Sequence, residues 1–240
     1  MEPVPAREAI IFDLFGTLVT GASDRSYRLF LEQTIELLGA DPDAFVTMWT
    51  SEEMRRLRAT GGLASSRAMV EEACRRLRLD PGEEAVRAAT RLRRDAMRDW
   101  LRPWPDAAWA LDRLHRAEYR FALMSDCTVE VPDLFEQLPF SRLFPVRLFS
   151  CELGTRKPDP AMYTLACQRL GVAPGRCLYV GDGASHELSG ARRAGMDAVL
   201  IDVPGHADNV VGREEARDWN GPRVASLTGL AEHLLGTAPG

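Results

Sequence analysis

Four polar signals fall where short apolar runs of the sequence end. They are Asp13 in FDLFGTL, Ser125 in ALMSDCT, Lys157 in TRKPDP, and Asp182 in YVGDGASHE. A carboxylate held rigidly at the end of a strand can attack a phosphoryl or alkyl group in line and form a covalent intermediate. Each signal alone is weak, because polar residues also cap the helices that follow strands. Their combination and order favour a catalytic site with Asp13 as the nucleophile.

Residues near the first two signals suit the same chemistry. Thr17 could hydrogen-bond and orient the carboxylate of Asp13, and Gly16 permits a tight turn between them. Ser125 and the neighbouring backbone N–H groups could hold the oxygens of an anion at the start of a helix. These residues predict a site that grips a phosphoryl group beside a carboxylate.

The elements that must position these residues are short strands separated by helical segments. Helical spacing of apolar residues covers Pro158–Leu170, and a further helix is expected over Ser185–Ala194. This alternation is typical of an α/β fold with a doubly wound parallel sheet, in which ligands bind at the carboxyl ends of the strands. The expected strands are a run that ends at Asp13, Tyr119–Met124, Pro145–Phe149, Cys177–Val180 and Ala198–Ile201.

Between the first two strands the pattern changes to helices only, from about residue 23 to residue 99. This block is interpreted as a helical cap over the strand ends. We expect a cap domain over residues 21–99 and a catalytic core made of residues 1–20 and 100–240. The expected cap helices are one capped by Asp24 and ending near Gly39, one over Pro42–Leu57, one from Ser65 or Ser66, and one from near Gly82.

Composition narrows the class of protein. The 240 residues are 45% hydrophobic and 27% charged, with a formal charge of −5, which is ordinary for a globular protein and unlike a chain that binds nucleic-acid phosphates. We expect neither a membrane span nor a signal peptide, because no apolar run is long enough. The five scattered cysteines have no CxxC spacing and predict free thiols in a reducing cytoplasm.

Motif for motif and over nearly the whole chain, the sequence resembles the haloacid dehalogenase-like hydrolase superfamily. The inserted helical block resembles the first cap type of that superfamily. The resemblance implies a Rossmann-like core, a covalent ester on Asp13, and a small-molecule substrate bound by Ser125, Asp126 and Lys157. It leaves the substrate itself and the oligomeric state open, since substrates are selected by the cap.

The resemblance also implies a Mg²⁺ site. Asp182 would complete it with Asp13 and the backbone carbonyl of Phe15, because hard cations favour oxygen ligands. Glu187, five residues after Asp182, would act through water or by holding another ligand.

The count of basic residues gives independent support. Twenty-nine of the thirty are Arg, and Lys157 is the one Lys. Arg presents a wide planar fork where Lys presents a compact charge, so the two are not interchangeable at a site that requires a point charge. The superfamily uses a lysine at this position to balance the nucleophile and the phosphoryl group, which favours an intact active site.

The departure from the superfamily pattern is Phe15. Most phosphatases of this type have a second Asp two residues after the nucleophile, which acts as general acid and base. Phe can do neither, and 2-haloacid dehalogenases also have an aromatic residue there, since halide leaves without a proton. If the protein is a phosphatase, its substrate leaves easily or a proton comes from His186 or Asp126.

The fourth motif, around Asp182, favours a phosphatase over a dehalogenase. Dehalogenases of this type work without metal and have Ser and Asn where this sequence has Gly181-Asp182. Their cap also has an Arg after a Trp to hold the substrate carboxylate, whereas Trp49 is followed here by Thr50. Arg55, Arg56 or Arg58 could substitute, although a run of Arg on a helix is usually a solvated face.

The sequence therefore predicts a Mg²⁺-dependent phosphatase of a small phosphorylated metabolite. A metal-independent 2-haloacid dehalogenase is the alternative, and a catalytically silent ligand-binding protein is a third interpretation with little support. The polar segment Gly205–Gly221 is interpreted as a surface loop that could border the site.

Overall fold

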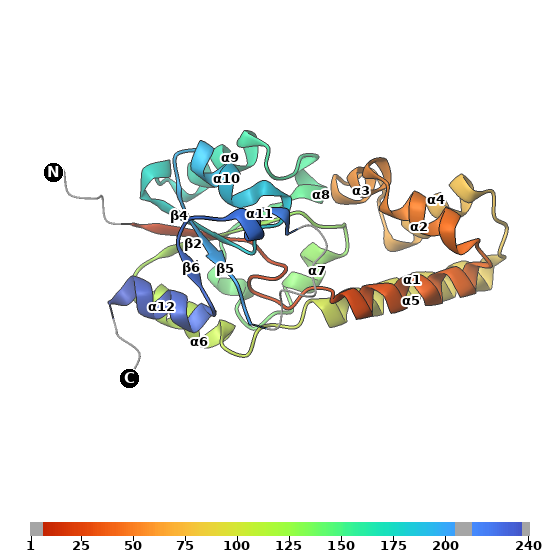
Figure 1. The fold of residues 1–240 in the computed structure, drawn as a ribbon, viewed down its shortest axis with the longest axis horizontal. Helices are drawn as coiled ribbons and strands as arrows, with labels where there is room; N and C mark the ends of the chain where they lie inside the picture. Colours follow the sequence, from red (N-terminus) through yellow and green to blue (C-terminus); the bar gives the residue numbers. More distant parts are fainter. Residues whose placement is uncertain (1–6, 205–212, 237–240) are drawn as a thin grey trace.

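The computed structural model describes residues 7–204 and 213–236, which form a six-stranded parallel sheet and a helical insertion (Figure 1). The strand order is β3-β2-β1-β4-β5-β6, and every neighbouring pair is parallel. The strands are β1 (Ala9–Phe12), β2 (Arg120–Ser125), β3 (Val146–Phe149), β4 (Cys177–Gly181), β5 (Asp197–Ile201) and β6 (Arg223–Val224). The α/β prediction and all five expected strands are confirmed; the two-residue β6 was not expected.

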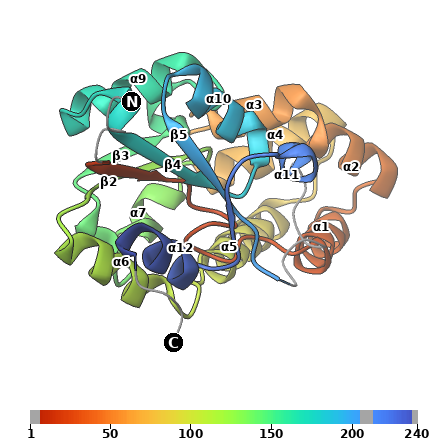
Figure 2. The ribbon, with the colours of Figure 1, turned by 60° about the vertical axis from the view of Figure 1, so that its left-hand side comes forward.

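Helices cover both faces of the sheet (Figure 2). The elements that follow the insertion are α6 (Ala107–Arg116), α7 (Val131–Phe135), η1 (Ser141–Leu143), α8 (Ser150–Leu153), α9 (Pro160–Leu170), η2 (Pro174–Arg176), η3 (Ala184–His186), α10 (Glu187–Arg193), α11 (Glu214–Asp218) and α12 (Leu227–Leu235). On β1, Ile10 and Phe12 belong to the core cluster that includes α6 and α12, while Ala9 and Ile11 belong to the cluster that includes α9 and α10. Alternate residues of a strand point to opposite faces, so all four are buried and the strand reads as a continuous apolar run.

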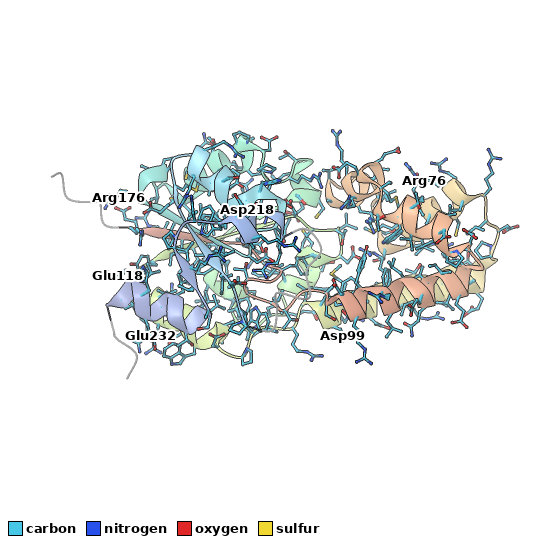
Figure 3. The ribbon with its side chains drawn as sticks, viewed as in Figure 1. Arg76, Asp99, Glu118, Arg176, Asp218 and Glu232 are labelled. Atoms are coloured by element: carbon cyan, nitrogen blue, oxygen red, sulfur yellow. The ribbon has the colours of Figure 1, made fainter. Side chains whose placement is uncertain are left out.

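The insertion forms a second lobe beside the sheet (Figure 1). Its helices are α1 (Asp24–Leu38), α2 (Pro42–Thr50), α3 (Glu52–Ala59), α4 (Ser66–Leu77) and α5 (Glu83–Trp100). Glu118 and Arg176 lie shortly before β2 and β4, and Figure 3 places them at the opposite end of the molecule from Arg76 on α4. The carboxyl ends of the strands therefore point toward the insertion. We propose that residues 21–99 form the cap domain.

Two expectations about the cap helices are wrong, and serine explains both. The segment Pro42–Leu57 is two helices, because Ser51 has extended backbone (φ −59°, ψ 147°) and its Oγ accepts a hydrogen bond from the N–H of Met54 at 3.2 Å. Ser23, not Asp24, is the N-cap of α1, with Oγ accepting from the N–H of Ser26 at 3.0 Å. Serine side chains compete with the helix for backbone groups, so they begin and end helices.

The inside of the cap is built around Trp49, which is 1% exposed. The ring of Phe45 stacks on it with centroids 5.6 Å apart, and the guanidinium of Arg58 lies 4.1 Å from its centroid. Arg58 also donates to the carbonyl of Trp49 at 2.9 Å. Burial and the charge of Arg93 lower the pKa of Arg58 to about 10. Arg58 therefore belongs to the cap core and not to a solvated face, whereas Arg55 and Arg56 are exposed.

Two contacts join the cap to the sheet lobe. Arg93 of α5 pairs with Glu130 at 2.9 Å, and both side chains are buried. Ser150, at the start of α8, donates through Oγ to the carbonyl of Ala59 in the cap at 2.6 Å. The same Oγ accepts from the N–H of Cys127 at 2.9 Å, so one hydroxyl links the cap to the loop after β2.

We predict that Ser150→Ala lowers the free energy of unfolding by about 1–3 kcal/mol, because it leaves the buried N–H of Cys127 without its partner. Denaturant unfolding measures the change. Ser189→Ala is the matched control, since its hydroxyl makes an exposed bond to the carbonyl of His186, and it should cost less than about 0.5 kcal/mol. Equal effects of the two substitutions would contradict the role of Ser150.

Candidate active site

The nucleophile candidate and the single lysine are in direct contact. Asp13 follows β1, and its Oδ1 lies 2.5 Å from Nζ of Lys157. Thr17 donates through Oγ1 to the other oxygen of Asp13 at 3.3 Å. All three side chains are buried. The carboxylate of Asp13 thus lies between the ammonium of Lys157 and the hydroxyl of Thr17.

Glu187 is the second acidic partner of Lys157. Its Oε2 lies 2.6 Å from the ammonium and accepts a hydrogen bond from the hydroxyl of Tyr179 at 2.8 Å. Its Oε1 accepts from the N–H of Gly183 at 3.0 Å. Gly181 makes this possible, because a Cβ there would lie 2.2 Å from Oε1 of Glu187. Both carboxylate oxygens of Glu187 are thus held in fixed positions.

Asp182 sits at the end of β4, beside the loop that carries the nucleophile. Its Oδ1 accepts from the N–H of Ala184 at 3.0 Å, and Nε of Arg213 lies 3.4 Å from its Oδ2. A Cβ on Gly16 would stand only 2.4 Å from that Oδ2, and Gly16 has φ of +74°, so both space and conformation require glycine there. The backbone of the nucleophile loop therefore approaches this carboxylate closely.

The electrostatics of the site are dominated by burial. Burial raises the pKa of Asp13 to about 7, although the ammonium of Lys157 acts in the opposite direction. Burial together with the charges of Glu187 and Asp13 raises the pKa of Asp182 well above its usual value. Burial also opposes the charge of Lys157, but the carboxylates of Asp13 and Glu187 outweigh it and raise the pKa of Lys157. In the described part of the chain, three buried carboxylates thus share two cations, Lys157 and Arg213.

This donor set fits a divalent metal ion. Ligand oxygens of Asp13, Asp182 and Glu187 lie within 4.8 Å of one another, and all three side chains are buried. Oδ2 of Asp182 has no hydrogen-bond partner among the described residues. Oxygen donors with an excess of negative charge are what a hard cation such as Mg²⁺ requires. The three predicted acidic residues therefore lie together and are compatible with Mg²⁺.

The remaining predicted residues border this cluster. Ser125 ends β2, the strand next to β1, and its buried Oγ has no hydrogen-bond partner among the described residues. Asp126 accepts the N–H of Lys157 at 2.9 Å, and burial raises the pKa of its carboxyl group. Phe15 is half-buried and lines a cavity, and so does His186.

That cavity has a volume of about 680 Å³ and lies between the strand-end loops and the cap. His186 and Ser185 both have left-handed backbone, with φ of 51° and 54°, in the part of the wall that follows Asp182. Non-glycine residues in this conformation are strained, and such strain gathers at functional loops. The side chains on the wall include Phe15, Tyr27, Glu52, Arg55, Met97, Trp100, Arg156 and His186.

Three further residues belong to the site and were not predicted from the sequence. Tyr179 was expected only as part of a strand, and its hydroxyl contacts Glu187. Arg213 lies in the segment expected as a surface loop, yet it is buried and donates to the carbonyl of Asp182 at 2.7 Å. Glu215, on α11, accepts the N–H groups of Leu188 and Ser189 at the start of α10. Residues 205–212 of that predicted loop lie outside the described residues; the one available signal was that the segment follows the end of a strand.

With this geometry in view, comparison with known proteins places the chain in a family. Residues 8–195 match the family of haloacid dehalogenase-like hydrolases, and the chain belongs to that family. The motifs at Asp13, Ser125, Lys157 and Asp182 indicated the same family. No helix in the described residues is long and apolar enough to cross a membrane.

Curated relatives include both kinds of enzyme that the sequence analysis compared. The chain is 34% identical over 128 residues to the glyceraldehyde 3-phosphate phosphatase of Methanopyrus kandleri, covering 53% of this chain and 55% of that protein. It is 38% identical over 110 residues to (S)-2-haloacid dehalogenase 4A of Burkholderia cepacia, covering 44% of this chain and 46% of that protein. The chain thus spans about half the length of these curated relatives.

Solved structures share the fold over nearly the whole chain. The L-2-haloacid dehalogenase of Xanthobacter autotrophicus with chloropropionic acid covalently bound has a TM-score of 0.63 at 20% identity, with 97% of this chain and 100% of that chain covered. This likeness supports the fold, the α/β core with its helical insertion, and not a choice between substrates.

We predict that Lys157→Arg lowers kcat/KM nearly as much as Lys157→Ala, about a hundredfold or more for each. The ammonium fits between Asp13 and Glu187 at 2.5 and 2.6 Å, and a planar guanidinium is too wide for that space. Steady-state kinetics on a phosphate ester measure the effect, with thermal unfolding of each variant as the check on folding. Retention of most of the turnover in the Arg variant would contradict the point-charge role.

Proposed function

We propose that the protein is a Mg²⁺-dependent phosphatase of a small phosphorylated molecule, acting through an aspartyl-phosphate on Asp13. The observation that carries the proposal is the position of Asp182, buried beside Asp13 and Glu187 with one oxygen free of hydrogen bonds among the described residues. A metal-independent enzyme would gain nothing from a third buried carboxylate at this place and would bear its electrostatic cost.

The chain's own residues supply most of the chemistry. The carboxylate of Asp13 attacks phosphorus, the bond from phosphorus to the leaving oxygen breaks, and the phosphoryl group is transferred to Asp13. Water then attacks phosphorus, which releases phosphate and restores the carboxylate. Lys157 would balance negative charge at both steps, and Oγ of Ser125 would donate to a phosphoryl oxygen. Mg²⁺ held by Asp13, Asp182 and the carbonyl of Phe15, with Glu187 next to them, would neutralise the charge on the phosphoryl oxygens.

Phe15 leaves this mechanism without the usual proton donor for the leaving oxygen. It occupies the position from which most phosphatases of the family donate a proton to the leaving oxygen, and it has no proton to give. The polar candidates for that task are His186, which lines the cavity, and Asp126, next to Ser125, whose pKa is raised by burial.

A second candidate function is hydrolysis of a 2-haloacid, which Phe15 favours. In that reaction the carboxylate of Asp13 would displace halide from carbon, and water would hydrolyse the resulting ester. The curated relatives include a haloacid dehalogenase as well as a phosphatase. Metal dependence separates the two functions.

We expect excess EDTA to abolish hydrolysis of phosphate esters and added Mg²⁺ to restore it, a change of at least about a hundredfold. Asp182→Asn should reduce this activity and also remove the rise in melting temperature that Mg²⁺ causes in the unmodified protein. Asp197→Asn is the matched control, because that carboxylate is exposed at the start of β5 and pairs with Arg7. Full activity on a 2-haloacid in EDTA, with none on phosphate esters, would replace the phosphatase by the dehalogenase.

The absence of an acid at position 15 predicts a steep dependence of rate on the pKa of the leaving alcohol. An alkyl alkoxide would depart as a strong base, so alkyl phosphates should react much more slowly than aryl or acyl phosphates. Phe15→Asp should make the slope shallower. The measurement is log kcat/KM against leaving-group pKa in both proteins, under conditions where the first chemical step limits the rate.

Two outcomes of that measurement would contradict the interpretation that the enzyme lacks a proton donor because position 15 is Phe. A shallow slope in the unmodified protein means that another residue donates the proton, and His186→Ala and Asp126→Asn would identify it. A steep slope that persists in a folded Phe15→Asp variant means that position 15 does not face the leaving group.

A further inference from the structure

The lining of the cavity beside the nucleophile loop combines three aromatic residues and a methionine with the charged side chains of Asp24, Glu52, Arg55 and Arg156. Phe15 from the sheet lobe and Tyr27, Met97 and Trp100 from the cap all line it. The rings of Tyr27 and Trp100 are 5.9 Å apart between centroids and tilted by 45°. Trp100 is 8% exposed and packs edge to face against Phe30 with centroids 5.6 Å apart, whereas Phe15 and Tyr27 are half-buried. Part of the ring surface therefore stays accessible.

The same cavity adjoins the loop that carries the nucleophile. It is lined by Phe15 and Gly16, two and three residues after the nucleophile, and Gly16 stands against the carboxylate of Asp182. A phosphoryl group held between Asp13 and Asp182 would thus have its ester oxygen and the attached group directed toward the cap. What lines the cavity decides which leaving groups fit.

The volume of the cavity also bears on which substrates would fill it. A volume of about 680 Å³ is in the range of sites for molecules larger than a few atoms. A short haloacid, or a phosphate ester of a small aliphatic alcohol, would leave most of this space filled with water against aromatic rings. A planar ring would instead cover the apolar wall, which releases that water.

We propose that the substrate class is aryl phosphomonoesters, in which an aromatic ring carries the esterified oxygen and lies against Tyr27, Trp100 and Phe15. The inference rests on the proposed phosphatase function and narrows it. Two independent observations support it: aromatic residues line the cavity, and Phe15, which has no proton to give, favours a leaving group that departs as a weak base. A phenolate satisfies both, because its negative charge is delocalised into the ring that the wall would hold.

The reaction balances without a further reactant. Asp13 forms the new bond to phosphorus as the bond from phosphorus to the aryl oxygen breaks, and the phenolate leaves with the electron pair. It takes its proton from solvent after departure. Water hydrolyses the aspartyl-phosphate, so the net products are a phenol and inorganic phosphate.

The test must separate stacking from leaving-group basicity. We therefore compare aryl phosphates with fluoroalkyl phosphates chosen so that the two alcohols have the same pKa. With Mg²⁺ present, kcat/KM should be about tenfold higher for the aryl ester at matched pKa, which is the size expected for one aromatic contact.

Variants of Tyr27 test whether the preference for the aryl ester comes from the cavity wall. Tyr27→Leu should lower kcat/KM about tenfold more for the aryl ester than for the fluoroalkyl ester, whereas Tyr27→Phe should keep the aryl preference. Trp109→Leu is the control for loss of an aromatic ring elsewhere, because Trp109 is 45% exposed on α6 and does not line the cavity. It should change neither substrate class.

A binding measurement on the unmodified protein keeps the inference testable if a variant fails to fold. Phenylphosphonate should inhibit competitively at about tenfold lower concentration than cyclohexylphosphonate, which has a ring of similar size that is not flat. Equal inhibition by the two, or equal rates for the pKa-matched esters, would overturn the aryl assignment while the phosphatase remained. Turnover of 2-haloacids with no turnover of either ester would overturn both.

Discussion

The site depends on one constraint: a single buried ammonium faces two buried carboxylates. Lys157 lies 2.5 Å from Asp13 and 2.6 Å from Glu187, and all three are shielded from water. Removing such groups from water costs several kcal/mol per ion, so this cluster does not exist to stabilise the fold. Its neighbours hold it in place. The hydroxyl of Tyr179 and the N–H of Gly183 fix Glu187, and Arg213 partly offsets the third acid. The parallel pairing of β1 with β4 brings the two acidic loops to one edge of the sheet.

Two aromatic residues of the cap, Tyr27 and Trp100, both pack inside the cap and line the cavity. Trp100 ends α5, where it packs against Phe30 inside the cap and also forms part of the cavity wall. Tyr27 packs against Trp100 and also lines the cavity. In the proposed aryl-phosphate site, selectivity is therefore coupled to the packing of α1 against α5. A substitution of Trp100 that reshapes the wall also removes its contact with Phe30 inside the cap.

Much of the fold and site could be read from the sequence because the signals were local. The apolar runs identified five strands, since central parallel strands are buried on both faces, and polar residues at their ends fell at one edge of the sheet. Arg213 and Tyr179 could not be assigned to the site this way, because their contacts depend on how the chain returns to the sheet. The break at Ser51 was missed because a serine that ends one helix and begins the next leaves apolar periodicity almost undisturbed. The two-residue β6 has no periodicity to detect.

The placement of the one lysine also determines how the protein responds to reagents that modify amines. All other basic side chains that carry a permanent charge are guanidiniums, so an acylating reagent finds a single side-chain amine, and it is 4% exposed. That amine is held in its protonated form by the surrounding carboxylates and is a poor nucleophile as long as they remain. Reaction at this amine would therefore report a disturbance of the carboxylate cluster itself. The one side-chain amine of the protein therefore lies in its interior.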